Sequence, residues 1–145
     1  YRAEQYLAKV APLEDFNRTT DVIVGFPGED ERAFENTLEV VESAGISAVH
    51  VFPYSPRPGT ATAGEDPVPR SVKRERSARM RRLSAELSRR RWRTKLGTVD
   101  RVLVDRPGRG YAADYTPWLL DAPVGAIVEA RAVGLAEEGI RAVAA

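Results

Sequence analysis

The sequence predicts an α/β segment followed by a small, OB-like antiparallel β-barrel. Helical and β-prone stretches alternate in the first part of the chain, whereas several short β-prone runs separated by turn residues follow Leu96. A long basic stretch of helical character lies between the two parts. We therefore expect three segments, at residues 1–69, 70–96 and 97–145, with the main boundary near Leu96.

The first expected elements are a helix and a buried parallel strand. Apolar residues recur at helical spacing within residues 1–11, which predicts a helix that ends before Pro12. A β-branched apolar run then predicts a strand from about Arg18 to Gly25. This strand leads into Gly-Phe-Pro-Gly, a sequence typical of a sharp turn.

A second helix and a second strand follow this turn. Asp30 is expected to cap the helix, and Gly45 is expected to end it in a left-handed conformation. Residues 47–52 are again β-prone. The order strand, helix, strand favours a parallel pair with a right-handed crossover. The apolar face of the helix consists of Phe34, Thr37, Leu38 and Val41.

Residues 53–69 are rich in proline and glycine and predict a long loop. This loop leaves the same end of the sheet as the turn at Gly28. Ligands of parallel α/β sheets bind at the carboxyl ends of the strands. We therefore place the candidate site between the turn and the loop.

Residues 70–96 predict a long basic helix that Gly97 ends. The segment from Arg70 to Lys95 contains twelve basic and two acidic residues, a net charge of +10. The rest of the chain therefore has a net charge of −9. Two interpretations stay open: the helix binds RNA phosphates, or the acidic remainder of the protein neutralises it. Its narrow apolar stripe is Val72, Met80, Leu83 and Leu87.

The expected barrel strands lie at residues 99–104, 110–115, 117–120, 126–133 and 139–143, with Pro107-Gly108, Pro123 and Gly134 between them. Aromatic and basic residues are mixed here, as they are in proteins that bind single-stranded nucleic acid. Small barrels also need aromatic residues for their cores, so both roles stay open. The residues concerned are Arg101, Arg106, Arg109, Tyr111, Tyr115 and Trp118.

Composition excludes several kinds of site. The chain has no cysteine, so it holds neither a disulfide nor a cysteine-ligated metal, and we expect no metal site. The single histidine, His50, lies in the middle of a predicted strand, which is typical of a core histidine rather than a catalyst. No apolar run approaches the roughly 18 residues that span a bilayer. Because the chain begins within a predicted helix, we expect it to be part of a longer protein.

Several motifs in order resemble the C-terminal portion of the tRNA-modifying radical S-adenosylmethionine (SAM) methylthiotransferases. These motifs are TTDVIVGFPGED, FENTLEVV, HVFPYSPRPGTATA, the basic helix and GYAADY. The resemblance covers nearly the whole chain. It implies the last part of a split (β/α) radical-SAM barrel followed by an RNA-binding TRAM barrel.

The resemblance also implies a chemistry. In this family a [4Fe-4S] cluster on a CxxxCxxC motif cleaves SAM, and a methylthio group is added to carbon 2 of an adenosine at position 37 of tRNA. The cluster ligands belong to an N-terminal portion, which is absent here. We therefore expect this chain alone to be inactive, with tRNA and the N-terminal portion as its partners, in a cytoplasmic enzyme.

The resemblance further implies site residues, although no catalytic residue can be assigned. Arg57 is typical of the tRNA-modifying branches rather than the ribosomal-protein branch, and His50 with Pro53 is typical of the threonylcarbamoyladenosine enzymes rather than the isopentenyladenosine enzymes. Glu29 lies one residue later than the family's acidic position, and a purely structural turn is the alternative. The expected SAM contacts are Ile23, Gly25, Phe26, Gly28 and Glu29; the substrate contacts are Tyr54 and Arg57; the RNA contacts are Arg74, Arg81, Arg101 and Tyr111.

Three other functions stay open. The chain could act as a non-catalytic RNA-binding module, which predicts steeply salt-dependent binding to anticodon arms. It could be a structural fragment whose open sheet edge pairs with missing strands or with a second copy. The third alternative is methylthiolation of isopentenyladenosine tRNA or of a ribosomal protein.

Overall fold

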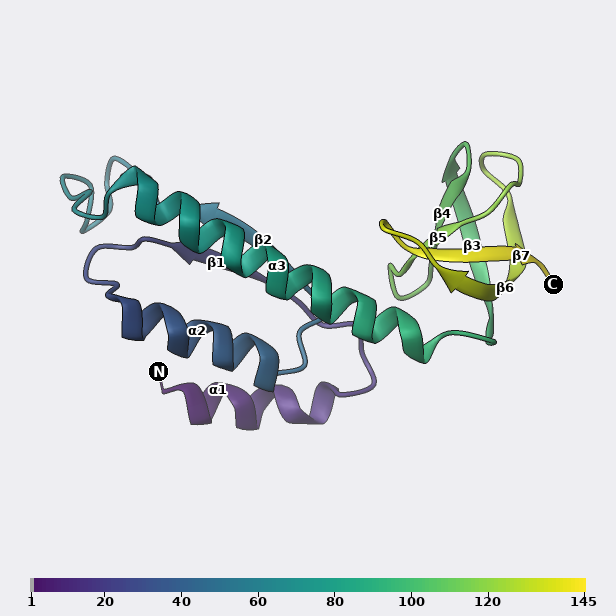
Figure 1. Ribbon diagram of the computed structural model, residues 1–145, viewed down its shortest axis with the longest axis horizontal. Coiled ribbons are helices and arrows are strands. Elements are labelled where there is room, and N and C mark those ends of the chain that lie inside the picture. The colour runs from purple at the N-terminus through teal and green to yellow at the C-terminus, as the bar shows by residue number, and fades with distance from the viewer. Residues whose placement is uncertain (1) are drawn as a thin grey trace. The chain divides into compact units, whose positions relative to one another are not determined.

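The computed structural model describes residues 2–145, which form two separate units (Figure 1). The first unit extends to Leu87 and the second runs from Ser88 to Ala145. The division falls within the long helix α3 (Arg70–Thr94). The last turns of α3 belong to the second unit because Trp92 packs against the core of the barrel.

Two parallel strands form the centre of the first unit. Strand β1 (Thr19–Val24) pairs with β2 (Ala48–Pro53), and Val22 lies opposite Val51. Helix α2 (Glu31–Ser43) connects them. The predicted strand, helix and parallel strand are therefore confirmed. These are the only two strands in this unit among the described residues.

The helix ends follow the local sequence. The side chain of Asp30 accepts a hydrogen bond from Ala33 N at 2.7 Å, and Gly45 has a φ of +61°, so both predicted caps of α2 are confirmed. Before β1 lie helix α1 (Ala3–Val10) and a short 3₁₀ helix η1 (Ala11–Leu13). Pro12 lies inside η1, where its fixed φ is tolerated.

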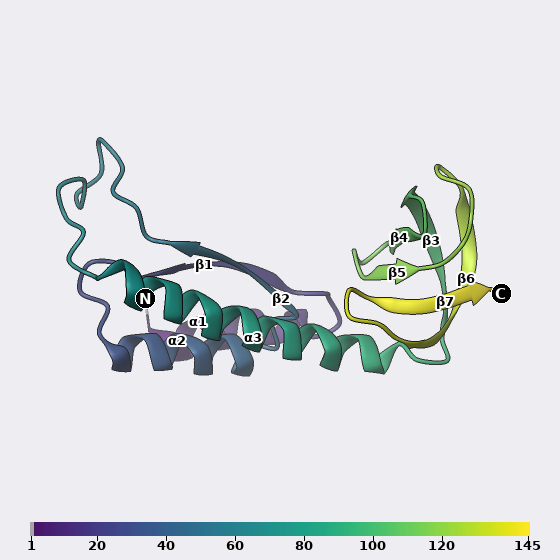
Figure 2. The ribbon, with the colours of Figure 1, turned by 45° about the horizontal axis from the view of Figure 1, so that its top comes forward.

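One face of the β1–β2 pair packs against α2 and α3 (Figure 2). Val22 and Val24 are buried there against Phe34 and Met80. Because side chains alternate along a strand, the other face carries Asp21, Ile23, His50 and Phe52, which are all exposed. Among the described residues, the expectation of a buried strand therefore holds for only one face of β1.

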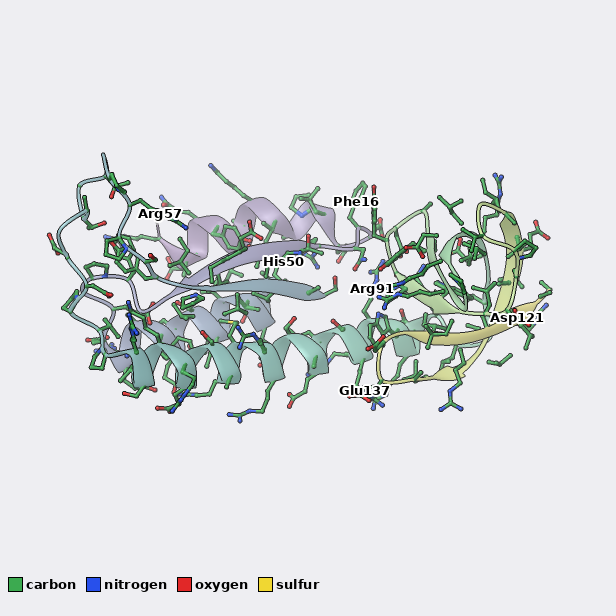
Figure 3. All side chains as sticks on the ribbon, turned by 90° about the horizontal axis from the view of Figure 1, so that it is seen from above. Phe16, His50, Arg57, Arg91, Asp121 and Glu137 are labelled. Carbon is green, nitrogen blue, oxygen red and sulfur yellow. The ribbon has the colours of Figure 1, made fainter. Side chains whose placement is uncertain are left out.

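The exposed face also corrects the expectation for His50. Its register partner is Asp21, and both side chains are exposed. Figure 3 labels His50 on its strand. His50 is therefore not a core histidine. The alternation of strand side chains decides this, because its neighbours Val49 and Val51 pack against the core.

The second unit contains a closed five-stranded barrel with strand order β3-β4-β5-β7-β6. All five strands were predicted, and the core includes Val102, Trp118 and Ile140. One pairing, β5 with β7, is parallel rather than antiparallel. The strand bounds are β3 (Val99–Arg106), β4 (Arg109–Ala112), β5 (Pro117–Leu119), β6 (Ile127–Leu135) and β7 (Ile140–Ala144).

The sequence predicted that Gly134 separates two strands, and this prediction is wrong. The glycine lies inside β6, directly after a register shift between Ala132 and Gly134. A glycine in a strand marks a bulge as readily as a turn. The connection from β6 to β7 lies at residues 136–139 instead. None of the helices between residues 2 and 145 is long and apolar enough to cross a membrane.

Tyr115 has the only positive φ, +61°, among the described non-glycine residues. Its N–H donates to Ala112 O at 2.9 Å, and Thr116 N donates to Asp114 Oδ1 at 3.0 Å. The side chain is 81% exposed, so packing does not offset the strain of this conformation. The turn is therefore held by the hydrogen bonds of its neighbours.

We expect Tyr115→Asn to raise the free energy of unfolding of the barrel by about 0.5 kcal/mol, because asparagine adopts this conformation more readily. Both tryptophans, Trp92 and Trp118, lie in the second unit, so urea unfolding followed by their fluorescence reports on the barrel. Gly108→Ala is the matched control, because Gly108 has a φ of +75° and open space around it. It should destabilise by about 1 kcal/mol. A Tyr115→Asn variant less stable than the wild type would contradict this account.

Candidate functional site

A cavity of about 590 Å³ lies on the exposed face of the strand pair, toward the carboxyl ends of β1 and β2. It is where the sequence placed the site, between the turn after β1 and the loop after β2. Four predicted contacts line it together: Ile23, Phe26, Tyr54 and Arg57. The other lining residues are Asp21, Phe52, Pro53, Ser55, Thr60, Ala61 and Thr62.

Aromatic contacts fix the wall of this cavity. The rings of Phe26 and Tyr54 meet edge to face, with centroids 5.1 Å apart. The Tyr54 hydroxyl lies 2.9 Å from both Thr62 O and Thr62 Oγ1, and Tyr54 N donates to Val24 O at 2.8 Å. The loop therefore folds back on its own first residue, and the Tyr54 ring is held in one position.

Among the described residues that line the cavity, Arg57 is the only cation, and it lies on the loop after β2 (Figure 3). Its side chain is exposed and makes no ion pair within the part of the chain that the structure describes. Its carbonyl accepts hydrogen bonds from Thr60 N at 3.3 Å and Thr60 Oγ1 at 2.8 Å. A fixed backbone with an unpaired guanidinium suits a carboxylate or phosphate ligand.

The glycine turn after β1 packs against α3 rather than lining the cavity. Gly25 has a φ of +76°, and a Cβ there would lie 2.5 Å from Cγ of Lys73. Its N–H donates to Glu29 Oε1 at 3.1 Å. Of the predicted SAM contacts, Ile23 and Phe26 therefore line the cavity, whereas Gly25, Gly28 and Glu29 do not.

A buried ion pair holds the turn to α3. Arg76 is 5% exposed, and its Nη1 donates to Glu29 Oε1 at 2.7 Å and to Glu29 O at 3.0 Å. The second nitrogen, Nη2, lies 3.4 Å from Glu31 Oε2. The same guanidinium lies 5.5 Å from the centre of the Phe34 ring. Arg76 thus ties the end of the turn and the start of α2 to α3.

Arg79 extends this network along α2. It donates to Glu31 Oε1 at 2.5 Å and pairs with Glu35. Its hydrogen bond with Glu31 lowers the pKa of that carboxyl, and its hydrogen bond with Glu35 raises the pKa of the guanidinium. Part of the basic helix is therefore neutralised by the protein itself.

Lys73 connects the turn to the long loop. Its Nζ donates to Tyr54 O at 2.9 Å, pairs with Asp66 and lies 5.3 Å from the centre of the Tyr54 ring. Lys73 and Arg76 were not predicted as site residues, because both were counted with the basic surface. They are buried. Their spacing of three was the available signal, since it places them on the helix face that also carries Met80.

The predicted RNA contacts lie on both units. Arg74 and Arg81 are exposed on α3, and Arg101 is exposed on β3. Tyr111 is half-buried on β4, with the Arg109 guanidinium 5.3 Å from the centre of its ring. Trp118 is fully buried, so this aromatic residue of the barrel belongs to the core.

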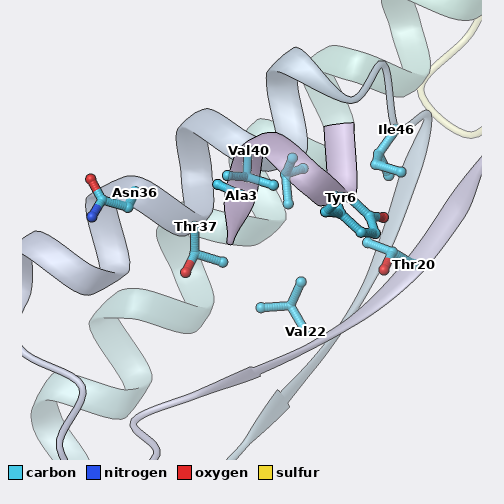
Figure 4. Close-up of a pocket in the computed structure, with 9 residues that line it drawn as sticks. Ala3, Tyr6, Thr20, Val22, Asn36, Thr37, Val40 and Ile46 are labelled. Carbon is cyan, nitrogen blue, oxygen red and sulfur yellow. The ribbon is translucent and has the colours of Figure 1, made fainter. Parts of the chain in front are cut away.

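An apolar groove of about 360 Å³ lies between α1, α2 and β1 (Figure 4). Tyr6, Thr20, Val22 and Ile46 contribute to its walls. None of the described residues that line it is charged. Because its described walls offer hydroxyl and amide groups but no charged group that could pair with an ionised ligand, it is a weaker candidate than the cavity at Arg57.

The implied cofactors differ in how well they fit this chain. The apolar residues Ile23 and Phe26 suit the base of SAM. The chain has no cysteine to hold an iron–sulfur cluster. Among residues 2–145, no group of three or more histidine, aspartate or glutamate side chains could hold a metal ion. The residues therefore fit the organic cofactor but not the cluster.

No protein-family model matches the chain. Individual relatives do. A tRNA-2-methylthio-N(6)-dimethylallyladenosine synthase of Corynebacterium jeikeium is 41% identical over 114 residues, which cover 75% of this chain and 22% of the relative. A threonylcarbamoyladenosine tRNA methylthiotransferase of Thermotoga maritima is 38% identical over an alignment of 151 positions, which covers 97% of this chain and 35% of the relative.

Over most of its length the chain is similar to tRNA methylthiotransferases. This confirms the resemblance drawn from the motifs. The chain spans between about a fifth and a third of the length of the curated methylthiotransferases it matches. Relatives named for two different adenosine derivatives match it at similar identity.

In the second unit, Asp114 lies at the end of a network that ties α3 to the barrel. Lys95 Nζ lies 2.8 Å from Asp114 Oδ2 and 3.1 Å from Asp100 Oδ2, and Arg91 Nη2 lies 3.4 Å from Asp114 Oδ2. Burial by itself raises the pKa of Asp114, but hydrogen bonds from Lys95 and Thr116 outweigh it and lower the pKa to about 2.

We expect Arg76→Ala to destabilise the first unit by about 3 kcal/mol, because it leaves the Glu29 carboxylate without its buried partner. Faster amide hydrogen exchange in β1 and α2 would measure this loss. Arg82→Ala is the matched control, since Arg82 is exposed and makes no ion pair among the described residues. It should cost less than about 0.5 kcal/mol. Equal effects of the two changes would show that Arg76 does not hold the turn to α3.

Asp114→Asn should lower the stability of the barrel by about 1 to 2 kcal/mol at pH 6. A carboxyl whose pKa is depressed stabilises the folded state above its ordinary value of 3.8, and this stability is lost as the pH falls through about 2. The difference from the wild type should therefore disappear between pH 4 and pH 2, measured by tryptophan fluorescence in urea. Asp121→Asn, at an exposed position, should show no such pH dependence. A constant difference would exclude Asp114 ionisation as the cause.

Proposed function

We propose that this chain is part of a tRNA methylthiotransferase that adds a methylthio group to carbon 2 of N6-threonylcarbamoyladenosine at position 37 of tRNA. The observation that carries the proposal is the unpaired Arg57 in an apolar cavity, within a chain 97% of which matches a threonylcarbamoyladenosine enzyme. In this proposal the 145 residues supply one wall of the site and are inactive alone.

The cavity suits a modified adenosine. Phe26, Phe52 and Tyr54 offer flat apolar surface to a base, and Arg57 offers two parallel hydrogen bonds to the threonyl carboxylate. SAM bound at an iron–sulfur cluster supplies the radical chemistry. The residues of this chain bind and orient: Ile23 and Phe26 pack on the ligands, and Arg57 fixes the carboxylate.

A dimethylallyladenosine substrate is the second candidate. A relative named for that substrate is 41% identical to this chain, and the apolar cavity wall suits a hydrocarbon substituent. That substituent carries no charge, so it gives Arg57 no partner. The two candidates therefore differ in what they require of one side chain.

The direct test uses the full-length protein, reconstituted with iron and sulfide and supplied with SAM and a reductant. We expect the 2-methylthio derivative to appear by mass spectrometry in tRNA that carries threonylcarbamoyladenosine. The 145-residue chain alone should give none. Product only from dimethylallyladenosine tRNA would favour the second candidate, and no product from either tRNA would overturn the proposed function.

Arg57→Ala in the full-length enzyme should lower kcat/KM for threonylcarbamoyladenosine tRNA by about 10- to 100-fold, as expected when hydrogen bonds to a charged group are lost. With dimethylallyladenosine tRNA the change should stay below about threefold, because no carboxylate is present. Arg57→Lys keeps the charge and should fall between the two. Equal losses of kcat/KM on both tRNAs would show that Arg57 does not bind the carboxylate.

A further inference from the structure

A second cavity, of about 440 Å³, shares the segment 53–55 with the first. One face of α3 forms its floor, with Arg70, Arg74, Ser77 and Arg81 at spacings of three and four residues. Lys73 and Asp66 also line it. The cavity lies entirely within the first unit.

The charges in this cavity are unbalanced. Lys73 and Asp66 pair with each other. Arg70, Arg74 and Arg81 have no carboxylate partner within the described residues, whereas Arg76 and Arg79 on the same helix do. The cavity therefore carries a net charge of +3 on side chains that are not neutralised by the protein.

Ser77 adds an unpartnered hydrogen-bonding group. The residue is 3% exposed, and its Oγ is buried with no hydrogen-bond partner among the described residues. A buried hydroxyl without a partner costs about 1 to 3 kcal/mol. Because Ser77 lines the cavity between two arginine positions, an anion with acceptor oxygens would satisfy it.

We propose that this cavity binds a phosphate group of the RNA backbone, next to the nucleotide that occupies the first cavity. Arginines surround the phosphate, and the Ser77 hydroxyl donates to one of its oxygens. The role as an RNA phosphate site rests on the proposed function, whereas the affinity for phosphate follows from the cavity alone. Tyr54 lines both cavities, so a strand of RNA that passes it would place its base in one cavity and its phosphate in the other.

The first test compares two neighbouring arginines in the 145-residue chain. Arg81→Gln removes a cation from the cavity, whereas Arg82→Gln removes one beside Glu35, Glu39 and Glu86. With an anticodon stem-loop RNA as probe, Arg81→Gln should weaken binding about three- to tenfold and reduce the slope of log K against log salt by about 0.7 to 0.9. Arg82→Gln should leave both nearly unchanged. Equal effects would overturn the site and leave only a diffuse basic surface.

The second test changes no charge. Ser77→Ala should lower affinity for the RNA and for inorganic phosphate about threefold or more, while the stability of the chain stays equal or rises. A purely structural Ser77 would change neither affinity. Nuclear magnetic resonance shifts of α3 amides on titration with inorganic phosphate give the second readout.

The two probes separate the source of the phosphate. Loss of affinity for both probes in Ser77→Ala and Arg81→Gln supports the RNA site. Loss for inorganic phosphate alone would overturn the RNA assignment and identify a site for free phosphate. Unchanged affinity for both would overturn the cavity as a phosphate site. None of these outcomes depends on methylthiolation, so failure here and failure of the proposed function are distinguishable.

Discussion

The ion pair between Arg76 and Glu29 is the contact on which the candidate site depends. It is almost fully buried, and the same guanidinium also reaches the Glu29 carbonyl. Glu29 in turn accepts the N–H of Gly25. One charged contact therefore sets the direction in which the chain leaves β1, and with it the position of Phe26 in the cavity wall.

The charge of α3 is divided between two tasks. Lys73, Arg76 and Arg79 pair with acidic residues of the loop, the turn and α2. Arg70, Arg74 and Arg81 have no such partner in the described part of the chain. The two interpretations of the basic helix are thus not exclusive. The basic residues that pair with the protein and those that have no such partner lie on different faces of one helix. A count of charges along the sequence cannot make this distinction.

The fold could be predicted from sequence where local signals are strong. The β-branched run of β1, the cap at Asp30 and the turn residues of the barrel each specify structure over a few residues. The meeting of Ile23, Phe26, Tyr54 and Arg57 followed from the rule that loops at the carboxyl ends of strands lie together. The bulge at Gly134 and the burial of Lys73 depend on partners distant in sequence, which periodicity does not specify.

Tyr54 belongs to both cavities, and this has a thermodynamic consequence. Its carbonyl accepts from Lys73 on one side, and its ring packs on Phe26 on the other. A ligand that draws Lys73 away from this carbonyl changes the free energy of the ring position. Linkage requires the reverse effect to be equal, so any change in affinity that a ligand in one cavity causes at the other is matched by the same factor in return. Tyr54 is the residue through which such an effect would pass from one cavity to the other.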